Sequence, residues 1–444
     1  MADNGWREVV LEDVASEITV GHVGPMALEY VADGIPFLRS QNVEYLRINT
    51  DDIKFISPGF HGRLQKSSLK PGDVVIVRTG KPGTCAIIPE SLPVANCSDL
   101  VIVRCGAELD PRFLAYYVNS IASSHVAAHL VGAVQQHFNV GSARTISLSL
   151  PPLYQQRAIA HILGTLDDKI ELNRRMNETL EGIAGAIFKS WFVNFDPVRA
   201  KAEGRDTGMP KHIADLFPDS FVDSELGEIP KGWEVLSLAE CVNVARGLSY
   251  KGSGLSNSGL PMHNLNSVHE GGGYKYEGIK YYEGEYKPHH VVRAGDVIVA
   301  NTEQGHFRLL IGYAAIVPER FGGECLFSHH IYRVRSKNSL GLTPDYLCQL
   351  LNTSVMHDTV SGYANGTTVN MLPIDGLQSP QIVVPPSVLI RFFDQHAKSI
   401  RKRLEEMIDE NRTLAALSDT LLPKLISGEI RISEAEKLTE GVNV

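Results

Sequence analysis

The chain has 444 residues, 43% of them hydrophobic and 21% charged, which is typical of a folded protein with more than one domain. Its 51 acidic residues outnumber its 42 basic ones, and the formal net charge of −9 argues against a protein that holds DNA by non-specific attraction alone. No apolar run approaches the ~20 residues of a membrane span, no signal-peptide pattern opens the chain, and the six cysteines lack metal-site spacing. We therefore expect a cytoplasmic protein with reduced cysteines and no membrane partner.

Residues 1–150 predict a first globular domain of class α+β. Short β-rich runs, such as DVVIVRT from Asp73 and LVIVRC from Leu100, alternate with Gly- and Pro-rich connections. The run DPRFLAYYVNSI from Asp110 has helical periodicity after a proline near its first turn. Together these runs predict a loop-rich sheet with one or two helices.

Residues 151–195 predict a long helix with a heptad seam, and residues 385–428 predict a second one. Seam positions that alternate steps of four and three keep one apolar stripe towards a partner helix. In the first helix the seam consists of Ile159, Leu163, Leu166, Ile170, Asn173, Asn177, Leu180, Ala184 and Ile187. In the second helix, 234 residues later, it consists of Phe393, Ala397, Ile400, Leu404, Met407, Asn411, Leu414, Ser418 and Leu421. Asn177 and Asn411 occupy matching places, and we interpret both as residues that fix register and partner choice.

The seam repeat is part of a duplication of the whole chain. GIPFLRSQNV at 34–43 matches GLPMHNLNSV at 259–268, so residues 233–384 predict a second α+β domain after a polar linker at 196–232, with a tail at 429–444. The offset between matching segments varies from about 223 to 233 in the globular parts and is constant at 234 along the helices. One inserted residue turns a helical seam by ~100°, whereas a surface loop tolerates it. We expect two loop-rich domains separated by two long antiparallel coiled-coil helices, related by a pseudo-twofold repeat.

Known catalytic and metal-binding patterns are missing from the sequence. It contains no G-x-x-x-x-G-K-[ST] phosphate loop, and SLPPLY at 149–154 has Leu150 where a methyltransferase would need Asn or Asp. Asp73 and Asp296 are interpreted as turn residues. The pairs His289-His290 and His329-His330 lack the helical spacing and the carboxylate of a metal site. We expect no catalytic residue and no metal site in this chain.

Three loop regions in each half combine base-competent polar side chains with small residues. Arg matches guanine O6 and N7, and Asn and Gln match adenine N6 and N7. In the first half the candidates for DNA contact are Arg39, Gln41, Asn42, Arg78, Thr79, Lys81, Gln135, Gln136, His137 and Asn139. In the second half they are His263, Asn264, Asn266, Asn301, Thr302, Gln304, His306, Arg308, Asn365, Thr367, Thr368 and Asn370. The alternative for each residue is an ordinary solvated loop.

The chain resembles the specificity (S) subunit of Type I restriction–modification systems over nearly its whole length. The segments that carry this resemblance are PPLYQQRAIAHILGTLDDKIELNRRMNETLEGIAGAIFKSWFVNFDPVRAKAEG, LFPDSFVDSELGEIPKGWEV and NRTLAALSDTLLPKLISGEI. The resemblance implies two target recognition domains that each read half of a bipartite double-stranded DNA site. It also implies two methyltransferase (M) subunits as partners, with two restriction (R) subunits as further candidates. S-adenosylmethionine would bind the M subunits and ATP the R subunits, with no cofactor in this chain.

Two departures from the repeat and two rival functions remain. The second Pro-Pro step lacks the counterpart of Gln155-Gln156, and Pro423 stands where the first helix has Lys189, which puts symmetric docking of partners in doubt.

One rival is a single-chain DNA methyltransferase or nuclease with duplicated recognition domains, and the other is a coiled-coil scaffold that reads no sequence. A seam of ~28 residues spans ~42 Å, a little more than one DNA turn of ~34–36 Å, and this length predicts a target with an unread gap.

Overall fold

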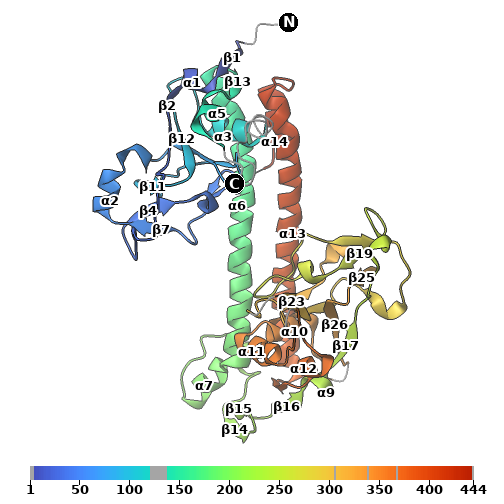
Figure 1. Cartoon of the computed structure of the whole chain (residues 1–444). Coiled ribbons are helices and arrows are strands. Elements are labelled where there is room, and N and C mark those ends of the chain that lie inside the picture. Colours follow the sequence, from blue (N-terminus) through green and yellow to red (C-terminus); the bar gives the residue numbers. More distant parts are fainter. Residues whose placement is uncertain (1–4, 121–137, 305–306, 338–339, 367–368, 443–444) are drawn as a thin grey trace. The chain divides into compact units, whose positions relative to one another are not determined.

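The computed structural model describes residues 5–120, 138–304, 307–337, 340–366 and 369–442. The chain forms two compact units: unit 1 comprises residues 1–173 and 410–444, and unit 2 comprises residues 174–409. Two long helices, α6 (Leu153–Phe188) and α13 (Ser387–Ile426), each contribute one part to either unit (Figure 1). The predicted α+β class with two long helices is therefore confirmed.

Unit 1 contains two main sheets and a strand pair. The four-stranded sheet has the order β10 (Cys85–Ile87), β9 (Val74–Val77), β12 (Leu100–Cys105) and β2 (Ala15–Val20). The five-stranded sheet has the order β3 (Tyr30–Val31), β7 (Lys54–Ile56), β4 (Ile35–Leu38), β11 (Ala95–Cys97) and β8 (Ser68–Leu69). The pair is β1 (Arg7–Val10) with β13 (Ser147–Leu150), and a short hairpin joins β5 (Val43–Glu44) to β6 (Arg47–Ile48). The helices are α1 (Leu11–Val14), α2 (Pro58–Arg63), α3 (Pro111–Ser120), α5 (Val140–Arg144) and α14 (Ile432–Thr439).

Unit 2 repeats this strand order. Its four-stranded sheet consists of β24 (Ala314–Ile316), β22 (Val297–Ala300), β26 (Ile331–Ser336) and β17 (Val242–Arg246). Its five-stranded sheet consists of β18 (Leu255–Ser256), β20 (Lys280–Tyr282), β19 (Leu260–His263), β25 (Cys325–Phe327) and β21 (Val291–Val292), and β16 (Glu234–Ser237) pairs with β28 (Gln381–Val384). A further pair joins β23 (Thr302–Gln304) to β27 (Val369–Met371). The helices between β16 and β28 in the described chain are α9 (Leu238–Cys241), α10 (Pro344–Leu351), α11 (Ser354–Gly362) and α12 (Ile374–Gln378).

The segment 196–232, expected to be a linker, contains regular structure in unit 2. It forms α7 (Asp196–Ala202), α8 (Lys211–Ala214) and a hairpin of β14 (Phe221–Ser224) with β15 (Gly227–Pro230). Phe217 is 2% exposed and belongs to the main core of the unit. Aromatic residues in this polar stretch therefore attach it to the unit.

The central strands are apolar at every position because both faces of the four-stranded sheet are covered. In β9, Val74 and Ile76 face a core that includes α3, whereas Val75 and Val77 face a second core beneath the five-stranded sheet. In β22, Val297 and Val299 contribute to the main core of unit 2, and Ile298 and Ala300 to a separate cluster. Alternation along a strand thus supplies two cores at once.

The long helices pack against each other within each unit. In unit 1 the first part of α6 shares a core with the last part of α13, through residues such as Leu166 and Leu421. In unit 2 the end of α6 meets the start of α13, where the rings of Phe188 and Phe393 are 5.5 Å apart. The helices therefore run antiparallel, and every predicted seam position is buried or half-buried.

Within unit 1, Asn173 is the polar centre of this helix packing. It is 2% exposed, and its side-chain amide donates to Asn411 Oδ1 at 2.9 Å and to Glu410 Oε2 at 2.8 Å. Because both bonds cross from α6 to α13, they favour one register of the two helices over its neighbours.

Candidate nucleic-acid interface

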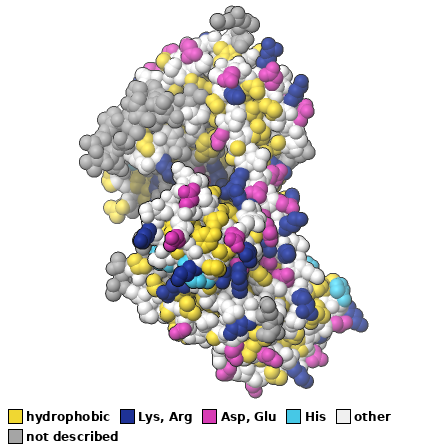
Figure 2. Space-filling model, turned by 90° about the vertical axis from the view of Figure 1, so that its right-hand side faces the viewer, with side chains coloured by type: hydrophobic (Ala, Val, Ile, Leu, Met, Phe, Trp, Pro, Cys, Tyr) yellow, Lys and Arg dark blue, Asp and Glu magenta, His cyan; other side chains and the backbone are white. Residues whose placement is uncertain are grey.

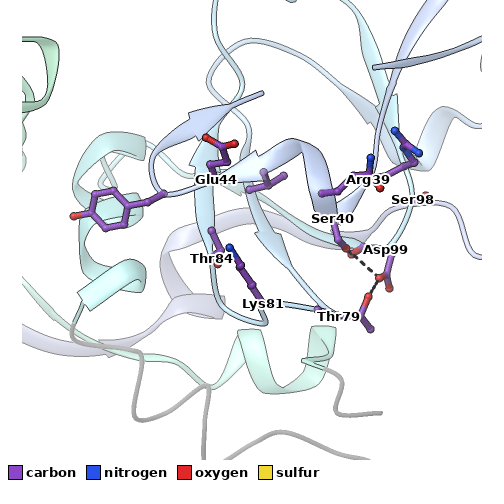
Figure 3. Close-up of a pocket in the computed structure, with 12 residues that line it drawn as sticks. Arg39, Ser40, Glu44, Thr79, Lys81, Thr84, Ser98 and Asp99 are labelled. Carbon is purple, nitrogen blue, oxygen red and sulfur yellow. Dashed lines mark hydrogen bonds between the residues drawn. The ribbon is translucent and has the colours of Figure 1, made fainter. Parts of the chain in front are cut away.

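Unit 1 contains a cavity of about 1010 Å³ where several strands end together. Its lining includes Arg39 and Gln41 after β4, Thr79 and Lys81 after β9, and Asp99 between β11 and β12 (Figure 3). β4 and β11 are parallel, so the connections that follow them leave from the same edge of the sheet. The connections that carry Arg39 and Asp99 therefore lie together, and the loop at Arg78 reaches them through its backbone hydrogen bond to Asp99.

Asp99 connects these loops. Its backbone lies in the left-handed region, with φ of 56°, and its carbonyl oxygen accepts from the backbone N–H of Arg78 at 3.4 Å. Ser40 Oγ donates to the carboxylate Oδ2 at 3.1 Å, and Thr79 Oγ1 donates to the same oxygen. Figure 3 shows both hydroxyls directed at Asp99. A single carboxylate thus ties the loop after β4 to the loop after β9.

Arg78 is held beside this network. Its Nε donates to the carbonyl oxygen of Phe138 at 3.2 Å, and its NH1 lies 3.6 Å from Asp99 Oδ1. Its side chain is 19% exposed, and its carbonyl oxygen accepts from the N–H of Phe138. These contacts hold Arg78 next to Thr79 and Asp99, which line the cavity, with its side chain partly exposed.

Arg39 and Gln41 share an acidic partner. The side chains of both donate to Asp52 Oδ2 at 3.0 Å, and Lys54 Nζ donates to Asp52 Oδ1 at 2.9 Å. The hydrogen bonds from Lys54 and Arg39 lower the pKa of Asp52 to about 2. Asp52 therefore stays ionised at neutral pH and orients both candidates.

Asn42 and Asn139 serve the local backbone. Asn42 is 2% exposed, accepts from the N–H of Arg39 at 3.0 Å and donates to the carbonyl oxygen of Asn49. Asn139 caps α5 by accepting from the N–H of Ser142 at 2.9 Å. Gln135, Gln136 and His137 lie outside the described residues.

Unit 2 has the same backbone frame with different side chains. The N–H of Asn301 donates to the carbonyl oxygen of His330, as that of Arg78 does to Asp99. The N–H of Leu372 donates to Asn301, as that of Phe138 does to Arg78. Thr302 Oγ1 is hydrogen-bonded to His330 Nδ1 at 2.9 Å, at the place of the Thr79–Asp99 bond. The matching contacts make His330 the counterpart of Asp99.

Several second-half candidates are buried. His263 is fully buried, bonded through Nδ1 to the Tyr274 hydroxyl, and burial lowers its pKa to about 4. Asn264 is 5% exposed and its Oδ1 accepts from the N–H of Asn266, whereas Asn301 is 1% exposed and donates to the carbonyl oxygen of His329. The structure thus places these side chains inside the frame of the loops.

The remaining candidates are spread over the loops of unit 2. Asn266 and Arg308 are exposed, Thr302 and Asn370 are buried, and Gln304 lies in β23. Asn365 donates to the carbonyl oxygen of Tyr363 at 3.1 Å. His306, Thr367 and Thr368 lie outside the described residues.

One loop of unit 2 is longer than its counterpart in unit 1. Six residues separate Arg78 from Cys85, whereas twelve separate Asn301 from Ala314. The buried carboxylate of Glu303 accepts from the N–H groups of Leu309, Leu310 and Ile311 and so braces this loop. The two frames therefore present different surfaces at the same place.

Sequence reasoning did not select Ser40, Asp52, Asp99, Glu303 or His330. The candidates were chosen because Arg, Asn and Gln match purine edges, a criterion that carboxylates do not meet. The correspondence between Asp99 and His330 was also hard to see, because the two loops differ in length: one residue lies between Ser98 and Leu100, whereas two lie between Ser328 and Ile331. A comparison of both loops with the strands aligned would have exposed it.

Three general features limit what the described parts of the chain can do. No group of three or more His, Cys, Asp or Glu side chains that could hold a metal ion occurs among the residues described. None of the described helices is long and apolar enough to span a bilayer. On the face drawn in Figure 2, Lys and Arg side chains are interspersed with Asp and Glu side chains.

Comparison with a solved structure defines the class of the fold. The S subunit of a Type I restriction–modification system from M. genitalium superposes with a TM-score of 0.58 at 13% sequence identity, covering 96% of this chain and 97% of that one. The chain therefore has the fold of a Type I S subunit.

Sequence comparisons agree with this class. Residues 5–182 match the family model of the Type I restriction modification DNA specificity domain. The chain is 26% identical to the Type I restriction enzyme HindI specificity subunit of Haemophilus influenzae, over 96% of this chain and 99% of that protein. It is 24% identical to the MjaIX specificity subunit of Methanocaldococcus jannaschii, over 91% and 89% of the two chains. The chain is similar to the specificity subunits of Type I restriction enzymes, which confirms the resemblance drawn from its sequence.

Proposed function

We propose that this chain is the non-catalytic DNA sequence-specificity subunit of a cytoplasmic Type I restriction–modification enzyme. One observation carries the proposal: the same strand frame occurs twice, and its converging loops carry different side chains each time. Two similar frames with divergent side chains suit two readers of two different half-sites. Base edges in the major groove differ in donors and acceptors, so side chains on such loops can discriminate between them.

The recognition residues in this proposal are the loop side chains that reach the cavity or solvent. In unit 1 these include Arg39, Gln41, Arg78, Thr79 and Lys81. The buried candidates Asn42, His263, Asn264 and Asn301 hold the loops in shape. In this scheme residues 1–150 read one half-site and residues 233–384 read the other.

The partners follow from the same proposal. Two methyltransferase subunits would dock on the frame and carry S-adenosylmethionine, and restriction subunits, where they join, would carry ATP. The target would be a bipartite double-stranded site whose unread gap is set by the helices at 151–195 and 385–428. Packing of α6 on α13 within each unit supports a spacer built from paired helices.

The test uses the full chain produced together with its methyltransferase subunits. Methylated adenines are mapped across a host genome by single-molecule sequencing, with and without the gene for this chain. We expect one bipartite motif with a fixed gap that disappears without the gene. Exchanging residues 1–150 for the equivalent part of a related subunit should change one half-site alone.

Two results would contradict the proposal. Methyl transfer by the purified chain alone would favour a single-chain enzyme. Equal competition by scrambled and natural duplexes would favour a scaffold that reads no sequence.

A further inference from the structure

We propose that Asp99 determines specificity in the first half-site by accepting a hydrogen bond from the amino group of a base, either cytosine N4 or adenine N6. This inference rests on the proposed function and deepens it, because it names the class of base edge that one residue selects.

The carboxylate of Asp99 has acceptor capacity to spare. Oδ2 accepts from the hydroxyls of Ser40 and Thr79, whereas among the described residues Oδ1 has only the guanidinium of Arg78 nearby, at 3.6 Å. That separation is beyond hydrogen-bond length, and Arg78 already uses its Nε on Phe138. An ionised carboxylate has about four lone-pair sites. The side chain is 36% exposed and lines the cavity, so lone pairs remain accessible to a ligand there.

The charge of Asp99 restricts what that ligand can be. A carboxylate repels phosphate groups and donates nothing, so on DNA it can bind only a donor. In the major groove the donors are the amino groups of cytosine and adenine, while guanine and thymine present acceptors. Lys81 and Arg39 line the same cavity and can offset the negative charge as DNA approaches. The geometry therefore favours a base edge over a backbone contact.

Unit 2 supplies an internal comparison. His330 occupies the place of Asp99, and its Nδ1 is engaged with Thr302. Burial, His329 and Lys280 lower its pKa, so the ring is neutral near pH 7. A neutral imidazole with one nitrogen engaged can offer either a donor or an acceptor, and it lacks the net charge of Asp99. His330 therefore does not share the strict requirement for a donor that the carboxylate of Asp99 has.

A purely structural role for Asp99 is the alternative. In that case Asp99 would only brace the loops of Ser40 and Thr79, and its loss would weaken binding to every sequence. A specificity role makes a different prediction, because it changes the preference for the base at one position. The two roles are therefore separable by the pattern of preference.

The experiment selects from a duplex library with randomised half-sites, using the full chain with its methyltransferase subunits and sequencing the bound pool. For the wild type we expect cytosine or adenine to dominate at one position of one half-site, and the enriched base identifies which amino group is read. Asp99→Asn replaces one acceptor by a donor and keeps the shape. It should reduce that preference by about tenfold or more and shift it towards guanine or thymine.

Two controls keep the outcome interpretable. Ser40→Ala removes one brace and leaves the carboxylate, so the base preference should persist. His330→Asn should alter the second half-site and leave the first intact. Uniform weakening by Asp99→Asn across all positions, or an unchanged profile, overturns the inference while the proposed function stands. A wild-type complex that enriches no sequence overturns the proposed function itself, and with it the inference.

Discussion

The polar contact at Asn173 allows the helix packing of unit 1 to be tested quantitatively. Asn173→Leu removes a neutral hydrogen bond to Asn411, worth about 1 kcal/mol, and a second bond to the carboxylate of Glu410. Glu410 is exposed, so its bond contributes near the lower end of the range for charged partners. Burial of the new leucine side chain should stabilise the helix packing by roughly 1.5–3 kcal/mol. Asn411 Oδ1, however, loses its donor, which should cost about 1–3 kcal/mol. We expect a net destabilisation of about 1–3 kcal/mol.

The double variant Asn173→Leu/Asn411→Leu then distinguishes pairing from mere burial. With both amides gone, neither amide is left unpaired, and the exposed Glu410 is solvated by water. The double variant should therefore be more stable, by about 1–2 kcal/mol, than the sum of the two single destabilisations predicts. The assay is urea unfolding followed by circular dichroism, with hydrogen exchange to localise the change to α6. Gln395→Leu, at an exposed position of α13, controls for adding a leucine to a helix. Single effects that add within ~0.5 kcal/mol would refute the reasoning.

Three further predictions follow from contacts within the units. Arg401→Ala should destabilise unit 2 by about 3–5 kcal/mol in urea unfolding. The reason is that the carboxylate of Asp345, which is 8% exposed and lies 3.0 Å from Arg401 Nε, loses its cation. The control is Lys402→Ala: this side chain is 78% exposed, so its loss should change the stability by less than ~0.5 kcal/mol. Burial lowers the pKa of His263 to about 4, so the free energy of unfolding should fall as the pH drops from ~6.5 towards 4, by at most ~1.4 kcal/mol per pH unit. His263→Gln should flatten this slope. An unchanged slope would show that His263 is not the group responsible. Arg78→Ala should alter base preference in one half-site of the selected duplex pool, and equal loss in both halves would contradict two independent readers.

The helices were the most predictable part of the chain. Residues 151–195 and 385–428 were predicted to be helical, and α6 and α13 occupy 153–188 and 387–426 within them. A heptad seam repeats without insertions because a slip would displace every later contact, so its signal is strong. The sequence did not identify the partner of Asn411, which is Asn173. Which seam residues meet depends on the offset between two antiparallel helices, and the heptad pattern does not contain that offset.

The candidate site was less predictable, because loop residues were selected by the chemistry of their side chains. Asn42 and His263 have suitable donors and acceptors, yet both are buried and bonded to their own loops. Small polar side chains suit local backbone contacts as well as DNA contacts. Whether such a side chain serves its own loop or contacts DNA depends on whether it is buried. Burial cannot be read from the sequence of a short irregular loop, because such a loop has no periodic pattern of apolar residues. The segment at 196–232 was misleading for a related reason, since a few aromatic residues in a polar stretch attach it to a core.

The contrast between Asp99 and His330 suggests how such a frame can change its target. Each residue holds its place through its carbonyl oxygen, which accepts from the strand-end N–H of Arg78 or Asn301. A backbone contact does not depend on side-chain identity, so the frame survives substitution at this position. The side chain has a partner threonine in both units, which can donate to a carboxylate or pair with an imidazole, and in unit 1 it also accepts from Ser40. Positions held by the backbone but open to the cavity should therefore vary first when recognition changes, whereas buried residues such as Asn42 should resist change.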